Sequence, residues 1–372
     1  MVSLSNHERL AALLVIAVTA VVVVVRADDP VSSNVRYTGE IVRIFDRKCT
    51  PCHGDESLAM PLASYRQVRD WGRAIREEIV EQRMPPWSAA RGYQRFRNEL
   101  ALSAREATTV LTWLDGGMPR GDDKDLPGPV ALAPDDPPDL HLAVPAQRVP
   151  AGEEHVVRRI AIDAGAAADR AVARFVVKPG VRSVLRGALL FAGNDRDGDR
   201  WVGAWLPWQP QVAPPAPHAF LLPARGGMTL ELHYRGSERE VLDQPSVDVY
   251  FARAGAATTE LDVAAGPPAR LASAGRIWAI VPSADASTRS LEVIARRPNG
   301  AMDVLLWMPE YRHEWPQALV LDDPISLPAG TIVTTVAEPG TSAARVRLSL
   351  LPAPGRAAVK GVARPTRPQA EP

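Results

Sequence analysis

Residues 40–53 of the chain are EIVRIFDRKCTPCH, a short amphipathic segment followed at once by two cysteines and a histidine. Ile41, Ile44 and Phe45 fall on one face of a helix, since residues three and four apart are neighbours on a helix surface. This helix leads directly into the CTPCH run at 49–53, and the 372 residues contain no further cysteine. The stretch therefore predicts a helix whose end presents two thiols and an imidazole together.

The Cys-x-x-Cys-His spacing is typical of covalent haem attachment. The thiols of Cys49 and Cys52 add to the haem vinyl groups, and His53 becomes an axial ligand of the iron. A thioredoxin-like dithiol would follow a strand of a βαβ unit, whereas a helical pattern precedes this motif. A zinc site needs further cysteine or histidine ligands, and the next histidine is the distant His141. We therefore expect one c-type haem and an electron-transfer protein that is not an enzyme.

The other axial ligand is expected downstream, where Met60, Met84 and Met118 are the candidates. Met60 is too close to the motif to reach the opposite face of the haem easily. Met84 is followed by Pro85-Pro86, whose fixed φ angles hold the chain extended and present one side chain rigidly. We predict that Met84 binds the iron; the alternative is ordinary packing, which methionine does well.

The surrounding residues 34–120 predict a small helical domain that folds independently. One helix is expected over 70–83, where Trp71, Ile75 and Ile79 are four apart. Ser103-Ala104-Arg105-Glu106 is a capping box that begins a helix ending at Gly116-Gly117. Residues 121–149 are acidic and rich in proline, which predicts a semi-rigid linker.

The N-terminal residues 1–27 predict export. Leu10 to Val25 is an apolar run in which Thr19 is the only polar residue, and Arg26 ends it. Its length lies between a signal-peptide core and a minimal spanning helix, so a cleaved signal peptide and a membrane anchor both stay open. Either alternative predicts a periplasmic or extracytoplasmic protein, and the second anchors it to the inner membrane. Haem of the c type is attached on this side of the membrane.

From residue 150 the apolar pattern changes to a period of two, which predicts strands and an all-β region. Two sandwiches are expected, over 150–264 and 265–352, followed by a disordered tail over 353–372. The expected strands are Val156–Asp163, Ala171–Val177, Val184–Ala192, Thr229–Tyr234, Val247–Phe251, Leu291–Ala295, Asp303–Met308, Ile332–Val336 and Arg345–Leu350.

Two classes of ligand are disfavoured. The 43 basic and 43 acidic residues balance, whereas binding to nucleic acid favours a basic excess. The loop Asn194–Asp199 is rich in oxygen ligands, but its glycine is misplaced for an EF-hand and no downstream glutamate completes it. A solvated turn is the preferred interpretation of that loop.

Residues 34–120 resemble a class I cytochrome c domain. More narrowly, several stretches resemble bacterial proteins that fuse such a cytochrome to a copper type II, ascorbate-dependent monooxygenase module. The module of that family consists of two β-sandwiches similar to the peptidylglycine monooxygenase core, so the resemblance implies two jelly-roll-type sandwiches here. The stretches that carry it are Met84-Pro85-Pro86-Trp87, Phe96-Arg97-Asn98-Glu99, Leu102-Ser103, Trp113-Leu114-Asp115-Gly116-Gly117 and Gly121-Asp122.

The resemblance also implies positions for copper-binding histidines, and most of these positions lack histidine. Ser183-Val184-Leu185-Arg186 stands where the family has a histidine pair, and Leu232-His233-Tyr234-Arg235 keeps one histidine of a His-Tyr-His strand. A third motif, near Val281–Asp285, has none. Copper sites of this type need two or three imidazoles close together, so we expect a β-module without copper that serves docking or scaffolding.

Two alternatives stay open. A single copper site built from His218, His233 and His313 would make the chain a monooxygenase with the haem as its internal electron donor. A haem-based sensor or adaptor would bind a small ligand in place of Met84. The redox partner protein is not identified by the sequence.

Overall fold

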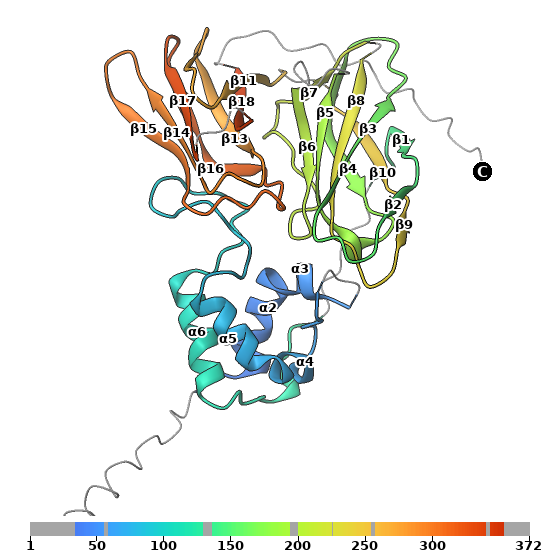
Figure 1. Cartoon of the computed structure of the whole chain (residues 1–372), viewed down its shortest axis with the longest axis vertical. Coiled ribbons are helices and arrows are strands. Elements are labelled where there is room, and N and C mark those ends of the chain that lie inside the picture. Colours follow the sequence, from blue (N-terminus) through green and yellow to red (C-terminus); the bar gives the residue numbers. More distant parts are fainter. Residues whose placement is uncertain are drawn as a thin grey trace, which may run out of the picture.

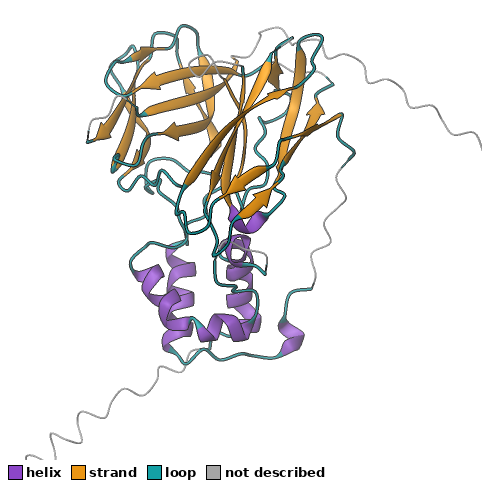
Figure 2. Cartoon of the chain, turned by 45° about the vertical axis from the view of Figure 1, so that its right-hand side comes forward, coloured by secondary structure: helices purple, strands orange, loops and turns teal. Residues whose placement is uncertain are grey.

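The computed structural model describes residues 34–55, 59–128, 136–193, 200–224, 226–253, 257–339 and 343–352. The predicted signal or anchor segment (1–27), the loop 194–199 and the tail 353–372 lie outside these residues. Helices gather at one end of the molecule and two groups of strands at the other (Figure 1), and the view from a second direction agrees (Figure 2). Within the described ranges, no helix is both long and apolar enough to cross a membrane.

The helical unit comprises residues 34–128. Its elements are the π-helical turn η1 (Tyr37–Ile41), α2 (Val42–Lys48), α3 (Thr50–His53), α4 (Tyr65–Asp70), α5 (Gly72–Val80), α6 (Ala104–Asp115) and the short η2 (Asp123–Asp125). The capping box is confirmed, because the Ser103 side chain accepts from the Glu106 N–H and the Glu106 carboxylate accepts from the Ser103 N–H.

The helix expected over 70–83 is α5, which begins at Gly72 and ends at Val80, and Trp71 separates it from α4. The Trp71 backbone leaves the helical region, at φ −99° and ψ 6°. A Cβ atom at Gly72 would lie 2.7 Å from Sδ of Met118, so a larger residue here would displace the end of the Met118 side chain. Trp113 is fully buried in the core of the unit, where its indole N–H donates to the Pro119 carbonyl at 3.0 Å.

The first group of strands forms two four-stranded antiparallel sheets with orders β1-β10-β4-β7 and β3-β8-β5-β6, and a small β2-β9 pair. Apolar residues of the two larger sheets share one core, to which Phe175, Leu190 and Leu232 belong. The bounds are β1 (Leu140–Ala143), β2 (Gln147–Val149), β3 (Val156–Asp163), β4 (Arg170–Lys178), η3 (Arg182–Val184), β5 (Leu185–Ala192), β6 (Arg200–Trp205), β7 (Phe220–Leu222), β8 (Gly227–Tyr234), β9 (Val241–Asp243) and β10 (Ser246–Phe251).

The second group forms sheets with orders β11-β18-β13-β16 and β12-β17-β14-β15, again antiparallel throughout. Trp278 of β13 packs on Trp201 of β6, with ring centroids 5.7 Å apart, which joins the two groups. The bounds are β11 (Thr259–Ala264), β12 (Ala269–Arg270), β13 (Gly275–Ser283), β14 (Ser290–Arg296), β15 (Met302–Met308), β16 (Leu319–Leu327), β17 (Ile332–Glu338) and β18 (Arg345–Pro352). We call β1–β18 the β-module.

Every strand expected from the period-two pattern is present, and the prediction of sandwich-like β-sheets is confirmed. Two boundaries differ from expectation. β1 and β2 lie inside the expected linker 121–149, where they pair with β10 and β9 because Leu140, Leu142 and Val149 supply a short apolar alternation between prolines. β11 precedes the expected division at 265, yet it pairs with β18 of the second group.

Residues 83–98, which we call the Met84 segment, leave the helices and pack on the second group of strands. In Figure 1 this segment is part of the blue-green loop between the helices and β16. Phe96 forms a bridge with Leu321, and the Arg97 N–H donates to the Val320 carbonyl at 2.9 Å. Trp87 and Phe96 pack against the core of the second group. The segment therefore ties the helical unit to the β-module.

Candidate cofactor site

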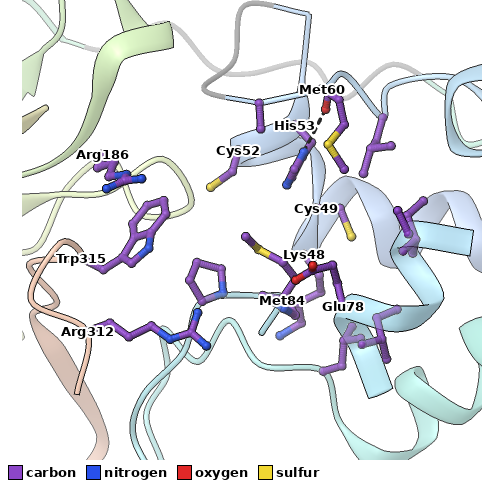
Figure 3. Close-up of a pocket in the computed structure, with 18 of the residues that line it drawn as sticks. Lys48, Cys49, Cys52, His53, Met60, Glu78, Met84, Arg186, Arg312 and Trp315 are labelled. Carbon is purple, nitrogen blue, oxygen red and sulfur yellow. Dashed lines mark hydrogen bonds between the residues drawn. The ribbon is translucent and has the colours of Figure 1, made fainter. Parts of the chain in front are cut away.

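A cavity of about 390 Å³ lies between the helical unit and the β-module (Figure 3). Its volume falls in the range of roughly 300–1,000 Å³ that is usual for small-molecule and cofactor sites. Cys49, Cys52, His53 and Met84 line it from the helical side. Sequence reasoning expected these four residues at one site, and the structure brings all four to one cavity.

Local helical geometry positions the cysteines and the histidine. The Cys49 N–H donates to the Phe45 carbonyl at 2.8 Å, which continues the turn from α2. In α3, the N–H groups of Cys52 and His53 both donate to the Cys49 carbonyl, at 3.1 and 2.9 Å. A single helical turn thus carries both thiols and the imidazole to the cavity wall.

A backbone hydrogen bond orients the imidazole of His53. Its Nδ1 lies 2.9 Å from the Met60 carbonyl oxygen, and because a carbonyl only accepts, Nδ1 carries the proton. Nε2 is then the nitrogen with the lone pair, as in metal-binding histidines whose other N–H is held by a backbone carbonyl. Burial lowers the pKa of His53, which favours the neutral ring that metals bind.

The two thiols have the protonated form and no disulfide. Burial raises the pKa of Cys49 to about 12, with the neighbouring Cys52 as the next cause, and burial raises the pKa of Cys52 to about 12 as well. A redox-active Cys-x-x-Cys dithiol needs a lowered thiol pKa instead. The site therefore disfavours the thioredoxin-like alternative.

The three candidate methionines lie in different places. Met84 is on the opposite side of the cavity from His53 (Figure 3). Met60 is on the same side as His53, and its carbonyl is hydrogen-bonded to the His53 ring. Met118 packs against the helical core beside Gly72. Met84 is 38% exposed, which disfavours ordinary core packing. Its role as an iron ligand stays a prediction.

The β-module holds the backbone on both sides of Met84. Arg312 donates from Nη1 to the Arg83 carbonyl at 2.9 Å, and Gln317 donates from Nε2 to the Pro86 carbonyl at 2.9 Å. Gln317 is only 3% exposed, so its bond is shielded from water. The module thus fixes the position of Met84, which local sequence patterns do not indicate.

The residues present fit a c-type haem. Two thiols, an imidazole with an available Nε2 and a thioether surround one cavity, whose other walls include the apolar Leu62, Ile75, Ile79 and Leu102. The β-module adds Arg186, Arg235, Arg312 and Trp315 to the lining, none of which the sequence placed at this site.

Three histidines meet nearby, between the two groups of strands. His155 Nε2 lies 3.1 Å from His233 Nδ1, and the His155 and His313 ring centroids are 4.8 Å apart. The Glu231 carboxylate accepts a hydrogen bond from His233 Nε2 at 2.9 Å, so in the neutral ring His233 Nδ1 accepts a hydrogen bond from His155 Nε2. His218 lies elsewhere, with Nδ1 bonded to the Pro215 carbonyl. Two of the three histidines considered for copper therefore meet, joined by His155 in place of His218.

His155 is the centre of this cluster: it is hydrogen-bonded to His233 and its ring packs edge-on against His313. Burial lowers the pKa of His155 to about 4, and the neighbouring His233 and His313 contribute to the shift. Across the described part of the chain, no three histidine, cysteine, aspartate or glutamate side chains are arranged to hold a metal ion. The expectation that copper is absent stays a prediction.

Comparison with known proteins adds no assignment. No protein-family model matches the chain, and no curated protein is significantly similar to it. The chemistry of the site therefore rests on the geometry of its own residues.

Proposed function

We propose that the chain is an exported c-type cytochrome that transfers single electrons through one covalent haem. The observation that carries this proposal is the convergence of Cys49, Cys52, His53 and Met84 on one cavity of about 390 Å³. A class I cytochrome c-like helical unit followed by two jelly-roll-type sandwiches is the matching proposal for the fold.

When bound, the haem supplies a one-electron couple at its iron, and His/Met coordination gives that couple a raised potential. Cys49 and Cys52 would anchor the group. The hydrogen bond from His53 Nδ1 to the Met60 carbonyl orients the imidazole and leaves the lone pair of Nε2 available for the iron. The apolar walls at Ile75 and Ile79 limit access of water, which raises the energy of the oxidised, more charged state.

The β-module serves as a scaffold for the site in this proposal. It closes one side of the cavity and bonds the backbone on both sides of Met84. The electron must then leave toward a redox partner protein through the remaining rim or through the module itself.

The test is maturation of the full chain in a periplasm with a working haem-attachment system and supplied copper. We expect one iron per chain, a haem that stays attached in denaturant, and the far-red absorption band of methionine-ligated ferric haem. Cys49→Ala and Cys52→Ala each remove one attachment bond, and Met84→Ala abolishes the far-red band while leaving the haem attached. A wild-type chain that matures without covalent haem contradicts the proposal.

The same preparation decides between the alternatives. Copper bound in stoichiometric amount, with ascorbate-dependent oxygen uptake, would identify a monooxygenase that uses the histidine cluster. Carbon monoxide that displaces Met84 from the ferrous protein at low concentration would identify a sensor. A carrier shows neither and has a single reversible potential.

A further inference from the structure

Three arginines from separate parts of the β-module line the cavity opposite the cysteine-histidine motif. Arg186 is on β5, Arg235 follows β8, and Arg312 lies between β15 and β16. Figure 3 shows Arg186 and Arg312 on the β-module side, next to Trp315. The Arg186 guanidinium lies 5.6 Å from the centre of the Trp315 ring, a cation–π contact that holds it in place.

The carboxylates of the chain compensate these guanidinium groups only loosely. Glu154 Oε2 lies 3.8 Å from Arg186 and 3.5 Å from Arg235, and the Glu154 side chain is 78% exposed. Glu310 lies 3.8 Å from Arg312 and is 80% exposed. Ion pairs this long and this exposed contribute little, about 0–1 kcal/mol each. The side chain of Arg186 is only 12% exposed; its Nη1 donates to the Glu154 backbone carbonyl at 2.8 Å, and its closest carboxylate in the described part of the chain is Glu154 at 3.8 Å.

The lining of the cavity carries an excess of positive charge. Lys48, Arg186, Arg235 and Arg312 are its cationic residues, against Glu78 and Glu314. The Glu78 carboxylate forms an ion pair with Arg83 at 2.9 Å, and the Glu314 carboxylate lies 3.4 Å from His313 Nδ1. Burial lowers the pKa of Arg186, and the charge of Arg235 lowers it further. An anion in the cavity would relieve both effects.

We propose that Arg186, Arg235 and Arg312 form a carboxylate-binding site on the β-module side of the cavity. The planar fork of arginine matches a carboxylate, with which it forms two parallel hydrogen bonds. Glu154, shared between Arg186 and Arg235, already shows that both guanidinium groups can approach one carboxylate oxygen. The carboxylate comes either from the propionate groups of the haem or from a small free acid; the first source rests on the proposed function above.

The test uses the matured full chain and the variants Arg186→Gln, Arg186→Lys and Arg235→Gln, since Arg312 also holds the backbone beside Met84. Arg296→Gln is the matched control, because Arg296 is an exposed arginine on β14 of the same module. Covalent haem is measured first in each protein. The potential is then measured against pH, and binding of sodium succinate is followed by calorimetry and by the Soret band, with sodium chloride at equal ionic strength as reference.

If propionates occupy the site, Arg186→Gln and Arg235→Gln lower the potential, because a positive charge near the iron is lost. The pH-dependent step in the potential moves to higher pH, since a propionate without its arginine ionises less readily. Arg186→Lys retains the charge but not the fork, and shows an intermediate step. Succinate then has no effect on any of the proteins.

If a free carboxylate occupies the site, succinate binds the wild type saturably and each glutamine variant binds it about tenfold more weakly or worse. The pH-dependent step is then unchanged. Variants that match wild type and Arg296→Gln in both measurements overturn the proposal. A chain without covalent haem refutes the proposed function, and calorimetry with succinate still decides whether the arginines bind carboxylate.

Discussion

Replacing Gln317 by leucine should loosen Met84 without removing the haem. Gln317 Nε2 donates to the Pro86 carbonyl at 2.9 Å, and the side chain is 3% exposed. Leucine has nearly the same size but no donor, so the variant leaves a buried carbonyl without its hydrogen bond. This loss costs about 1–3 kcal/mol. Pro86 lies two residues after Met84, so we expect most of this energy to act on the position of the methionine.

The expected magnitude follows from that energy. If the bond supports only the ligated conformation, a loss of about 1–3 kcal/mol raises the population of the unligated form about 5- to 150-fold. Imidazole added to the ferric protein binds the iron where Met84 has left it. Its apparent affinity should therefore rise by the same factor, measured from the loss of the far-red band during titration.

A matched control lies ten residues further along the same segment. Gln94 Nε2 donates to the Val304 carbonyl at 2.8 Å, which is also a contact between the Met84 segment and the second group of strands. Gln94→Leu should lower the free energy of unfolding by a similar amount, yet leave imidazole affinity near that of wild type. Equal imidazole affinities for Gln317→Leu and Gln94→Leu would refute the idea that the β-module positions Met84.

Two further predictions concern stability, and a third concerns the dependence of Met84 on the β-module. Burial raises the pKa of Glu260 to about 7, so folding favours the protonated carboxyl and the free energy of unfolding should fall as pH rises from about 4.5 to about 7. The loss is at most about 3 kcal/mol. Glu260→Gln should remove it, which denaturant titrations at about pH 5 and about pH 8 would measure. His155 has a pKa lowered to about 4, so stability should fall as pH decreases from about 6.5 to about 4, and thermal unfolding of His155→Asn should show a smaller decrease. A fragment of residues 34–128 should keep its attached haem but lose part of the far-red band, because Trp87 and Phe96 lose the apolar core on which they pack. A fragment with an unchanged band would contradict the dependence of Met84 on the β-module.

The elements that could be predicted are those whose signal is local. The capping box at Ser103 and the strands over Val156–Asp163 and Thr229–Tyr234 each follow from neighbouring residues and a periodic apolar pattern. The break at Trp71 was not predicted, because Trp71 shares the apolar spacing of Ile75 and Ile79 and therefore indicated a continuous helix. Strand β1 was not predicted either, because its four residues lie among prolines and pair only with the distant β10.

The residues of the site also fall into a part that the sequence predicts and a part that it does not. The motif Cys49 to His53 is contiguous, so one helical turn suffices to bring its thiols and imidazole together, and the sequence by itself determined that part. Only the tertiary structure decided what faces the motif. Arg186, Arg235 and Arg312 reach the cavity from strands and loops more than a hundred residues away, and Gln317 holds Pro86 across a sequence separation of 231 residues. No periodic pattern encodes such pairs, because they arise from the packing of the β-module against the Met84 segment.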